Sequence, residues 1–428
     1  MKTLIKNIDE LYTMQNNNFR LENVYITIMG SKIDKIGTGN INEESFDKVI
    51  DASGCIVLPG FINTHTHSAM SLVRGYADDL PLQQWLEDKI WPFEAKLSPE
   101  DIYWGSLLAI IEMLKTGTTT FVDMYFEIDK IAEAVALSGI RSVLSEGLIE
   151  DVDGIDGLKK AELNIFKARE IGEDRITGML APHAPYTCSP PYLQKIIARA
   201  EELNVPLNIH VAETRQERDD LIAEFNCSPV RFLEKQGTFS RPVLAAHCVH
   251  VDEEELEILK SNNVGVAFNP KSNMKLASGT APAAKILDLG INIGFGTDGA
   301  GSNNNLNLIE EARIGSYLQK VSYRDPTLMN VKDIGEMLTV KGARAANLNH
   351  MGQIRKGYLA DLILIDINSK PYFHPHHNNL SNLFYAAGGY SVDTVIINGK
   401  IVLKDGRLVN IEEEEVYHHI SQIVEKLK

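Results

Sequence analysis

The architecture can be worked out from one segment, Leu58-Pro59-Gly60-Phe61-Ile62-Asn63-Thr64-His65-Thr66-His67, in which an apolar run leads into two histidines one residue apart. Alternate residues of a β-strand face the same side. A strand that ends here would therefore direct both imidazoles towards one end of a sheet. Two histidines alone are weak support for a metal site, and the apolar run that precedes them strengthens that interpretation.

Further apolar runs follow this segment, separated by stretches whose apolar residues have helical spacing. With the first run included, the predicted strands span residues 60–67, 118–125, 141–148, 176–183, 206–213, 243–249, 264–269 and 292–298. Strands that alternate with helices over this length predict a (β/α)₈ barrel of the TIM type, with a doubly wound sheet as the alternative architecture.

The two ends of the chain have a different pattern, in which apolar and polar residues alternate as in antiparallel strands. The candidate strands are Val24–Ile28, Lys32–Ile36, Ala360–Ile367 and Thr394–Val402. The last of these contains Asn398-Gly399, a hairpin turn sequence. We expect residues 1–58 and 355–428 to pair into one small β-sandwich domain, and residues 59–354 to form the barrel.

Composition limits the classes of partner. The net charge of −16 argues against a protein that binds nucleic acid through its phosphates. The N-terminus lacks the apolar run of a signal peptide, and no stretch approaches the ~18 apolar residues of a membrane span. The four cysteines form no CxxC pair and are expected to be reduced. The sequence predicts a soluble cytoplasmic protein without a membrane partner, and it leaves room for a homo-oligomer.

Three later strand ends carry side chains of the same kinds as the first. His210 ends the fifth predicted strand, His247 the sixth and Asp298 the eighth. Active sites of (β/α)₈ barrels lie at the carboxyl ends of the strands. These three side chains would therefore meet His65 and His67 at one mouth of the barrel, and imidazole with carboxylate is the ligand mixture that borderline cations prefer.

Glu213 lies three residues after His210. Strand geometry would place these two positions on opposite faces, so Glu213 is expected just beyond the strand, where the chain turns over the mouth. That place suits a residue that transfers protons. The alternative is an acid that stabilises the N-terminus of the following helix.

Taken together, these residues resemble the amidohydrolase superfamily, specifically its nucleobase and nucleoside deaminases. Two other parts of the chain are more specific than the paired histidines: Leu82–Leu86 with Ile90–Glu94, and Ala181–Ser189. Through them the chain is similar, over nearly its whole length, to methylthioadenosine/S-adenosylhomocysteine deaminases, and also to 5′-deoxyadenosine deaminases. Triazine chlorohydrolases and guanine deaminases share the metal residues, which therefore do not identify the substrate.

The resemblance implies a metal site. Its ligands would be His65, His67, His210 and Asp298, and its ion one divalent metal per chain, with zinc expected first and iron or manganese as alternatives. Relatives with two ions bridge them by a lysine or an acid on the fourth strand. The segment Ile176–His183 offers neither, so a single ion is expected.

The resemblance also implies hydrolytic deamination of an adenosine-type nucleoside to the inosine analogue and ammonia. A bound divalent ion can lower the pKa of water from about 15.7 to about 7. Asp298 would accept a proton from this water, His247 would orient the attacking oxygen, and Glu213 would protonate the ring nitrogen beside the amino carbon. The alternatives are a hydrolase of guanine or triazine rings and an inactive protein of the same fold, which is expected to lack at least one of these residues.

The residues that the resemblance places on the substrate are Trp85, Glu94, His183, Glu146, Glu213 and Asp298. Glu94 would hold the two ribose hydroxyls, His183 would lie near the purine and sugar, and Trp85 would form an apolar wall. Glu146 is expected where relatives that accept S-adenosylhomocysteine carry an arginine for the substrate carboxylate. An acid there would repel that carboxylate by ~1 kcal/mol at ~4 Å in bulk water. We therefore expect a preference for 5′-deoxyadenosine, adenosine and methylthioadenosine, unless Glu146 turns away and caps a helix.

Overall fold

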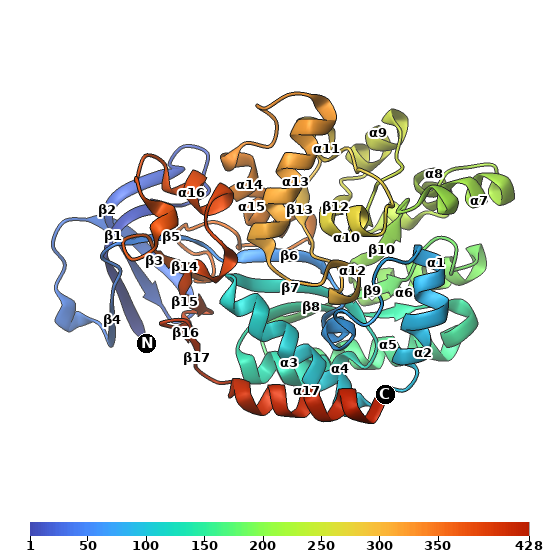
Figure 1. The fold of residues 1–428 in the computed structure, drawn as a ribbon, viewed down its shortest axis with the longest axis horizontal. Helices are drawn as coiled ribbons and strands as arrows, with labels where there is room; N and C mark the ends of the chain where they lie inside the picture. The colour runs from blue at the N-terminus through green and yellow to red at the C-terminus, as the bar shows by residue number, and fades with distance from the viewer. Residues whose placement is uncertain (428) are drawn as a thin grey trace.

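The computed structural model describes residues 1–427, and within them eight parallel strands form a barrel in the order β6 to β13. Their bounds are β6 Phe61–Thr66, β7 Thr118–Tyr125, β8 Arg141–Leu148, β9 Ile176–Pro182, β10 Leu207–Val211, β11 Val243–His247, β12 Gly265–Phe268 and β13 Ile293–Phe295. Each lies within one of the runs predicted from the sequence. The predicted (β/α)₈ barrel is confirmed, with its strands in the middle of the molecule and helices around them (Figure 1).

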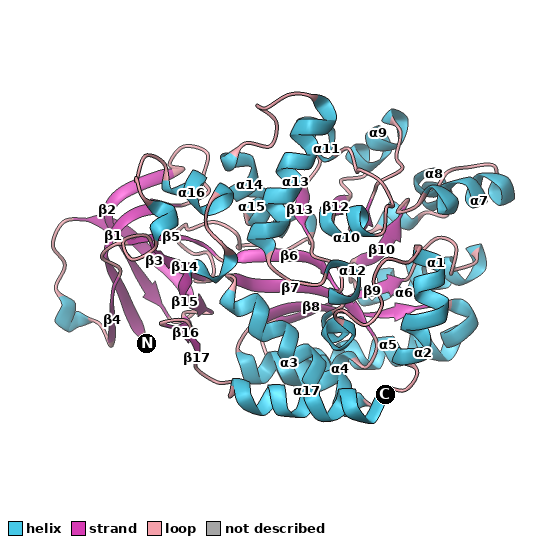
Figure 2. Cartoon of the chain, in the orientation of Figure 1, coloured by secondary structure: helices cyan, strands magenta, loops and turns pink. Residues whose placement is uncertain are grey.

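Helices cover the outside of the barrel (Figure 2). Those that follow β6 are η2 Ser68–Val73, α1 Leu82–Trp85, η3 Leu86–Ile90, α2 Trp91–Glu94 and α3 Pro99–Lys115. The later ones are α4 Ile128–Ser138, α5 Glu150–Gly172, α6 Pro190–Leu203, α7 Arg215–Phe225, α8 Pro229–Lys235, α9 Glu253–Ser261, α10 Pro270–Lys275, α11 Ala283–Asp288, α12 Ala300–Asn303, α13 Leu308–Tyr323, α14 Val331–Leu338 and α15 Val340–Ala345. Parallel strands joined in this way have both faces buried, which is why they appear in the sequence as nearly continuous apolar runs.

The barrel closes where its first and last strands meet. Thr297 donates its backbone N–H to Asn63 Oδ1 at 3.0 Å and accepts Asn63 Nδ2 on its hydroxyl at 2.8 Å. One residue later, Asp298 N donates to His65 O at 2.9 Å. Side chains that fill the interior below the mouth include Val122, Val143, Met179, Leu244, Ala246 and Ala267. The polar residues at the carboxyl ends of the strands therefore lie above a packed floor.

The second sheet combines both ends of the chain (left in Figure 1). Within residues 1–427 its strands run in the order β17-β16-β15-β14-β5-β1-β2-β3, and β4 also pairs with β1. Their bounds are β1 Lys2–Tyr12, β2 Arg20–Met29, β3 Lys32–Thr38, β4 Lys48–Asp51, β5 Cys55–Pro59, β14 Leu362–Asp366, β15 Val392–Ile397, β16 Lys400–Lys404 and β17 Arg407–Leu408. Residues from both ends, such as Ile26 and Leu362, share one apolar core. The predicted turn at Asn398-Gly399 joins β15 to β16, and both of its residues have positive φ.

The last helix departs from the predicted division into domains. α17 (Glu413–Leu427) lies along α3 of the barrel (Figure 1). Lys115 pairs with Glu413 at 2.6 Å, and the rings of Trp104 and His419 stack with centroids 3.8 Å apart. Residues 413–427 therefore pack on the barrel, although they were assigned to the small domain with the rest of 355–428. The other domain boundaries stay a prediction.

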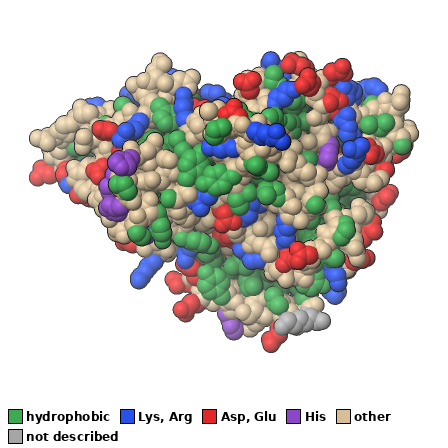
Figure 3. All heavy atoms as spheres, turned by 45° about the horizontal axis from the view of Figure 1, so that its top comes forward, with side chains coloured by type: hydrophobic (Ala, Val, Ile, Leu, Met, Phe, Trp, Pro, Cys, Tyr) green, Lys and Arg blue, Asp and Glu red, His purple; other side chains and the backbone are tan. Residues whose placement is uncertain are grey.

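The charges on the surface and the length of the helices are relevant to two predicted absences, of a nucleic-acid partner and of a membrane partner. On the face seen in Figure 3, lysine and arginine side chains are interspersed with aspartate and glutamate. Within residues 1–427, no helix combines the length and the apolar character needed to cross a membrane.

Candidate active site

Four histidines and an aspartate meet at the carboxyl ends of the barrel strands. One ligand atom each from His65, His67 and Asp298 lie within 4.8 Å of one another, and so do atoms of His65, His210 and His247. His67 Nε2 lies 3.2 Å from Asp298 Oδ1 and 3.4 Å from His210 Nε2. The structure thus brings together the residues predicted as metal ligands, with His247 beside them.

The far side of two imidazoles is held by backbone carbonyls. His67 Nδ1 donates to Met124 O at 2.5 Å, and His210 Nδ1 donates to His183 O at 2.7 Å. A carbonyl oxygen only accepts, so each Nδ1 carries a hydrogen, and in the neutral form of each ring Nε2 keeps its lone pair. Both lone pairs are available to one cation in the mouth, an arrangement common for metal-binding histidines.

His65 provides the test of whether a cation fits. Its side chain is fully buried, and neither ring nitrogen has a hydrogen-bond partner within residues 1–427. Burial lowers its pKa well below the usual value, so the ring is neutral. Buried polar atoms are rarely left without a partner. A cation that accepts the lone pair of His65 would satisfy this ring, which makes the residues present compatible with a divalent metal.

Asp298 is held as a carboxylate. Its Oδ2 accepts hydrogen bonds from the hydroxyls of Ser272 at 2.6 Å and Ser302 at 3.1 Å, and its Oδ1 accepts one from Gly299 N at 2.8 Å. Burial opposes ionisation, but the hydrogen bond from His67 and the neighbouring imidazoles outweigh it and hold the pKa of Asp298 well below its usual range. The same contact raises the pKa of His67 to about 9 against the effect of burial. Without a cation, a proton on His67 Nε2 therefore supplies positive charge beside Asp298, and a bound cation would take the place of that proton.

Glu213 reaches the mouth because the chain turns directly after β10. Ala212 has φ of 51°, in the left-handed region, and Glu213 Oε2 then lies 3.8 Å from His247 Nε2. Glu217 fixes this turn, since its carboxylate accepts the backbone N–H groups of Ala212 and Glu213, both at 2.8 Å. Burial, and then the charge of Asp298, raise the pKa of Glu213 to about 8. Its protonated form is therefore available at neutral pH.

His247 also depends on a break in strand geometry. Ala246 faces the barrel interior, so strand alternation would direct the next side chain outward. The φ values of 74° at His247 and 49° at Cys248 end this alternation and turn the ring into the mouth, with its centroid 5.5 Å from that of His65. Burial lowers the pKa of His247 to about 4, so the ring is neutral.

Three residues predicted to contact substrate lie around this cluster. Glu94 Oε1 accepts the hydroxyl of Tyr125 at 2.6 Å, and burial raises the pKa of Glu94 to about 7. The ring of His183 lies 4.8 Å from that of His210. Trp85 lies farther out, with its ring packed against Gly301. A Cβ at that glycine would lie only 3.0 Å from the ring.

Glu146 lies elsewhere, which corrects the placement expected from the sequence. Val143 of β8 faces the barrel interior, so Glu146, three residues later, faces the outer helices. Its carboxylate accepts Asn164 Nδ2 at 2.7 Å and lies 3.3 Å from Lys160 Nζ, both on α5. The prediction that Glu146 opposes a substrate carboxylate is therefore wrong, because the strand turns this side chain away from the mouth.

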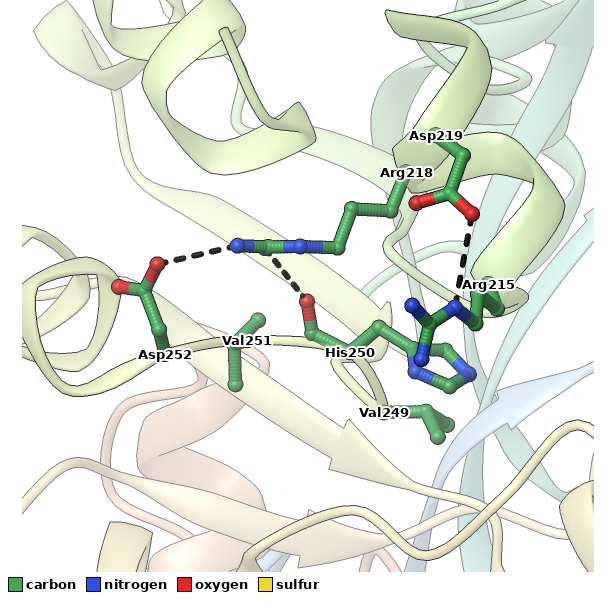
Figure 4. A pocket seen from close by; sticks show the side chains of 7 residues that line it. All are labelled: Arg215, Arg218, Asp219, Val249, His250, Val251 and Asp252. Atoms are coloured by element: carbon green, nitrogen blue, oxygen red, sulfur yellow. Dashed lines mark hydrogen bonds and ion pairs between the residues drawn. The ribbon is translucent and has the colours of Figure 1, made fainter. Parts of the chain in front are cut away.

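A polar pocket lies beside the segments that carry Glu213 and His247 (Figure 4). It is lined by Arg215, Arg218, Asp219, Val249, His250, Val251 and Asp252. Arg218 donates to His250 O at 2.9 Å and to Asp252 at 3.1 Å. This arginine therefore joins α7, which follows Glu213, to the loop that follows His247.

Several residues that support the site were not singled out from the sequence: Tyr125, Glu217, Asn269, Ser272, Asn273 and Ser302. Four of them lie in two short segments directly after strand ends, Asn269–Asn273 and Gly299–Ser302. Active-site residues of barrels cluster in such segments, so their position was the available signal.

The similarity of the chain to known protein families is consistent with this geometry. Residues 56–402 match the amidohydrolase family. The chain belongs to the amidohydrolase family. This amidohydrolase is 50% identical to a 5-methylthioadenosine/S-adenosylhomocysteine deaminase of Halothermothrix orenii, with all of both chains aligned. It is 46% identical to a protein of the same name from Syntrophomonas wolfei, over 100% of this chain and 99% of that one.

Solved structures give the same picture of the fold. The amidohydrolase superposes on an adenosine deaminase from Xanthomonas campestris with bound zinc, with a TM-score of 0.95, 30% identity and coverage of 99% of this chain and 98% of that one. An atrazine chlorohydrolase from Arthrobacter aurescens TC1, complexed with zinc, has a TM-score of 0.90 and 23% identity over 99% of this chain and all of its own. The second likeness concerns the fold alone.

Proposed function

We propose that this amidohydrolase removes the amino group of an adenosine-type nucleoside by hydrolysis and releases ammonia. One observation carries the proposal: Glu213, whose pKa is raised to about 8, lies 3.8 Å from His247 at the edge of the histidine and aspartate cluster. A protonated acid beside a cation site is what hydrolysis of a ring amidine requires. Relatives that match the whole chain at 46–50% identity are named 5-methylthioadenosine/S-adenosylhomocysteine deaminases.

The proposed cofactor is one zinc ion per chain, held by His65, His67, His210 and Asp298. When bound, it would supply a Lewis acid that lowers the pKa of a water molecule towards about 7. The Nδ1–H bonds of His67 and His210, which leave each Nε2 to the mouth, and the unpartnered ring of His65 support this ligand set. β9 offers no lysine or acid to bridge a second ion. The adenosine deaminase named above, at 30% identity, contains bound zinc.

The chain's own residues would move the protons. Asp298 is ionised and accepts a proton from the attacking water, while Ser272 and Ser302 hold its other oxygen. Glu213 in its acid form protonates the ring nitrogen beside the amino carbon, which makes that carbon more electrophilic. Asp298 then passes its proton to the departing amino group, and Glu213 recovers one from the new hydroxyl. Each such acid–base contribution is worth on the order of 10²–10⁴ in rate.

The nucleoside would be held by Glu94, His183 and Trp85. Tyr125 occupies one oxygen of Glu94 and leaves the carboxylate able to accept ribose hydroxyls. The repulsion expected from Glu146 is absent from the mouth, since that side chain pairs with α5. We therefore add S-adenosylhomocysteine to the expected substrates, beside methylthioadenosine, adenosine and 5′-deoxyadenosine.

The test is hydrolysis by the purified zinc-loaded enzyme, measured as ammonia release for the purine compounds and as chloride release for atrazine. The compounds are adenosine, 5′-deoxyadenosine, methylthioadenosine, S-adenosylhomocysteine, guanine and atrazine. We expect the adenosine compounds to be deaminated to inosine analogues, with loss of turnover in Glu213→Gln. Turnover of guanine or atrazine without turnover of any adenosine compound would contradict the proposal.

A further inference from the structure

His247 differs from His67 and His210 in what faces its Nδ1. The Nδ1 atoms of His67 and His210 face backbone carbonyls, which only accept hydrogen bonds. His247 Nδ1 faces two side-chain amides instead, with Asn273 Nδ2 at 2.9 Å and Asn269 Nδ2 at 3.3 Å. An amide nitrogen donates. In this arrangement Nδ1 is the acceptor, and the hydrogen of the neutral ring is on Nε2.

The opposite side of the ring has room for this hydrogen. His247 Nε2 lies 3.8 Å from Glu213 Oε2, beyond the length of a direct hydrogen bond, so the amides on Nδ1 are what select the tautomer. Both amide side chains are buried, and the backbone that carries them is tied at the start of α10, where Asn273 N donates to Asn269 O at 3.1 Å. Short segments after β12 therefore present two donors to one ring nitrogen.

From this contrast we propose that Asn273, assisted by Asn269, is a positioning residue that keeps neutral His247 in the Nε2–H tautomer. A nitrogen that carries hydrogen cannot bind a metal. The tautomer therefore divides the cluster at the mouth. The proposed ligands His65, His67, His210 and Asp298 hold the metal, and His247 stands outside the ligand set as a hydrogen-bond donor. The donor role in deamination rests on the proposed function, whereas the tautomer and the ligand set do not.

The experiment compares wild type with Asn273→Asp, which replaces the donor by a carboxylate that accepts a hydrogen bond from Nδ1–H. Zinc-loaded protein labelled with ¹⁵N-histidine is examined by NMR at neutral pH, and the His247 signals are assigned by their loss in His247→Gln. We expect Nε2–H in wild type and Nδ1–H in Asn273→Asp. Asn262→Asp, at the end of α9, is the matched control and should leave the His247 signals unchanged.

Two further readouts complete the test. Zinc content should stay at the wild-type level in His247→Gln and in Asn273→Asp, and kcat for methylthioadenosine should fall about 100-fold in Asn273→Asp with a smaller change in KM, as for a lost acid–base contribution. A wild-type ring with hydrogen on Nδ1, or loss of zinc in His247→Gln, would overturn the inference. If the tautomer is as expected and no adenosine compound is deaminated, the proposed function fails and the tautomer assignment stands.

Discussion

Glu146 and Glu213 are both glutamates at the carboxyl ends of barrel strands, yet only Glu213 reaches the mouth. Glu146 lies inside the regular part of β8, paired in register with Tyr125, and strand alternation turns it towards α5. Glu213 follows Ala212, whose left-handed backbone ends the alternation of β10. His247 and Asp298 also have positive φ. These three side chains thus reach the mouth where the backbone breaks strand geometry, at an energetic cost typical of functional sites.

The two glutamates also differ in how their charge is compensated. Burial raises the pKa of both. For Glu146, the hydrogen bond from Asn164 and the charge of Lys160 oppose this effect. For Glu213, the next-largest influence is the charge of Asp298, which raises the pKa further. The surroundings of Glu146 therefore stabilise an ion pair between the barrel and α5, whereas the surroundings of Glu213 stabilise its protonated form at the mouth.

The largest expected effect comes from removing the cation that the mouth is built to hold. His65→Ala and Asp298→Ala should each abolish both zinc binding and deamination, because ligand atoms of His65, His67 and Asp298 lie within 4.8 Å of one another. Metal analysis of the purified variants, with ammonia release, checks this. Two ions per chain at full occupancy in wild type would contradict the single-ion proposal.

Glu213→Gln tests the acid at the mouth directly. The amide keeps the shape and the contacts of the side chain but cannot deliver a proton, so kcat should fall at least ~100-fold while zinc is retained. Glu224→Gln, at an exposed position on α7, the helix that follows Glu213, is the matched control. Near-normal turnover in Glu213→Gln would mean that another group protonates the ring.

The pH dependence of kcat/KM should also reveal the titration of Glu213. Glu213 acts in its acid form, so kcat/KM should fall about tenfold per pH unit as pH rises through its pKa. That pKa is about 8 from burial and Asp298, and a cation bound nearby favours the carboxylate and lowers it. The descending limb should therefore lie at or below about pH 8. Its persistence in Glu213→Gln would assign the limb to a different group.

The difference between regular and interrupted strand geometry also explains how much of the fold could be predicted from the sequence. The barrel strands were found because parallel strands buried on both faces give apolar runs. Strand β1 was not found: a bulge between Ile5 and Ile8, with Asn7 in the left-handed region, interrupts the alternation that marks an antiparallel strand. Regular geometry leaves a pattern in the sequence, and its interruptions do not.

The site could be predicted only where residue type was informative. Histidines and acids at strand ends are rare enough to indicate a metal site, whereas Ser272 and Asn273 are common residue types whose partners lie far away in sequence. The direction of Glu146 was missed for another reason. Nearly every residue of β8 is buried, so polarity gives no sign of which residues face inward.

The smallest expected effect is at Glu146, and it is the one that separates the two regions most cleanly. Glu146→Gln should leave the ratio of kcat/KM for S-adenosylhomocysteine and methylthioadenosine within ~2-fold of wild type, equivalent to less than ~0.5 kcal/mol. The physical reason is that the carboxylate lies behind β8, against Asn164 and Lys160. Because both substrates are measured on one preparation, loss of folded protein cancels in the ratio.

Glu146→Arg sharpens the same test. A second cation beside Lys160 in a buried site should lower the melting temperature, since the pair that it replaces becomes a repulsion. The substrate ratio should still be that of wild type, because the new guanidinium faces α5. An arginine at the mouth would instead pair with the amino-acid carboxylate and shift the ratio towards S-adenosylhomocysteine by tenfold or so, ~1.4 kcal/mol. Such a shift would place residue 146 in the substrate site and remove the contrast with Glu213.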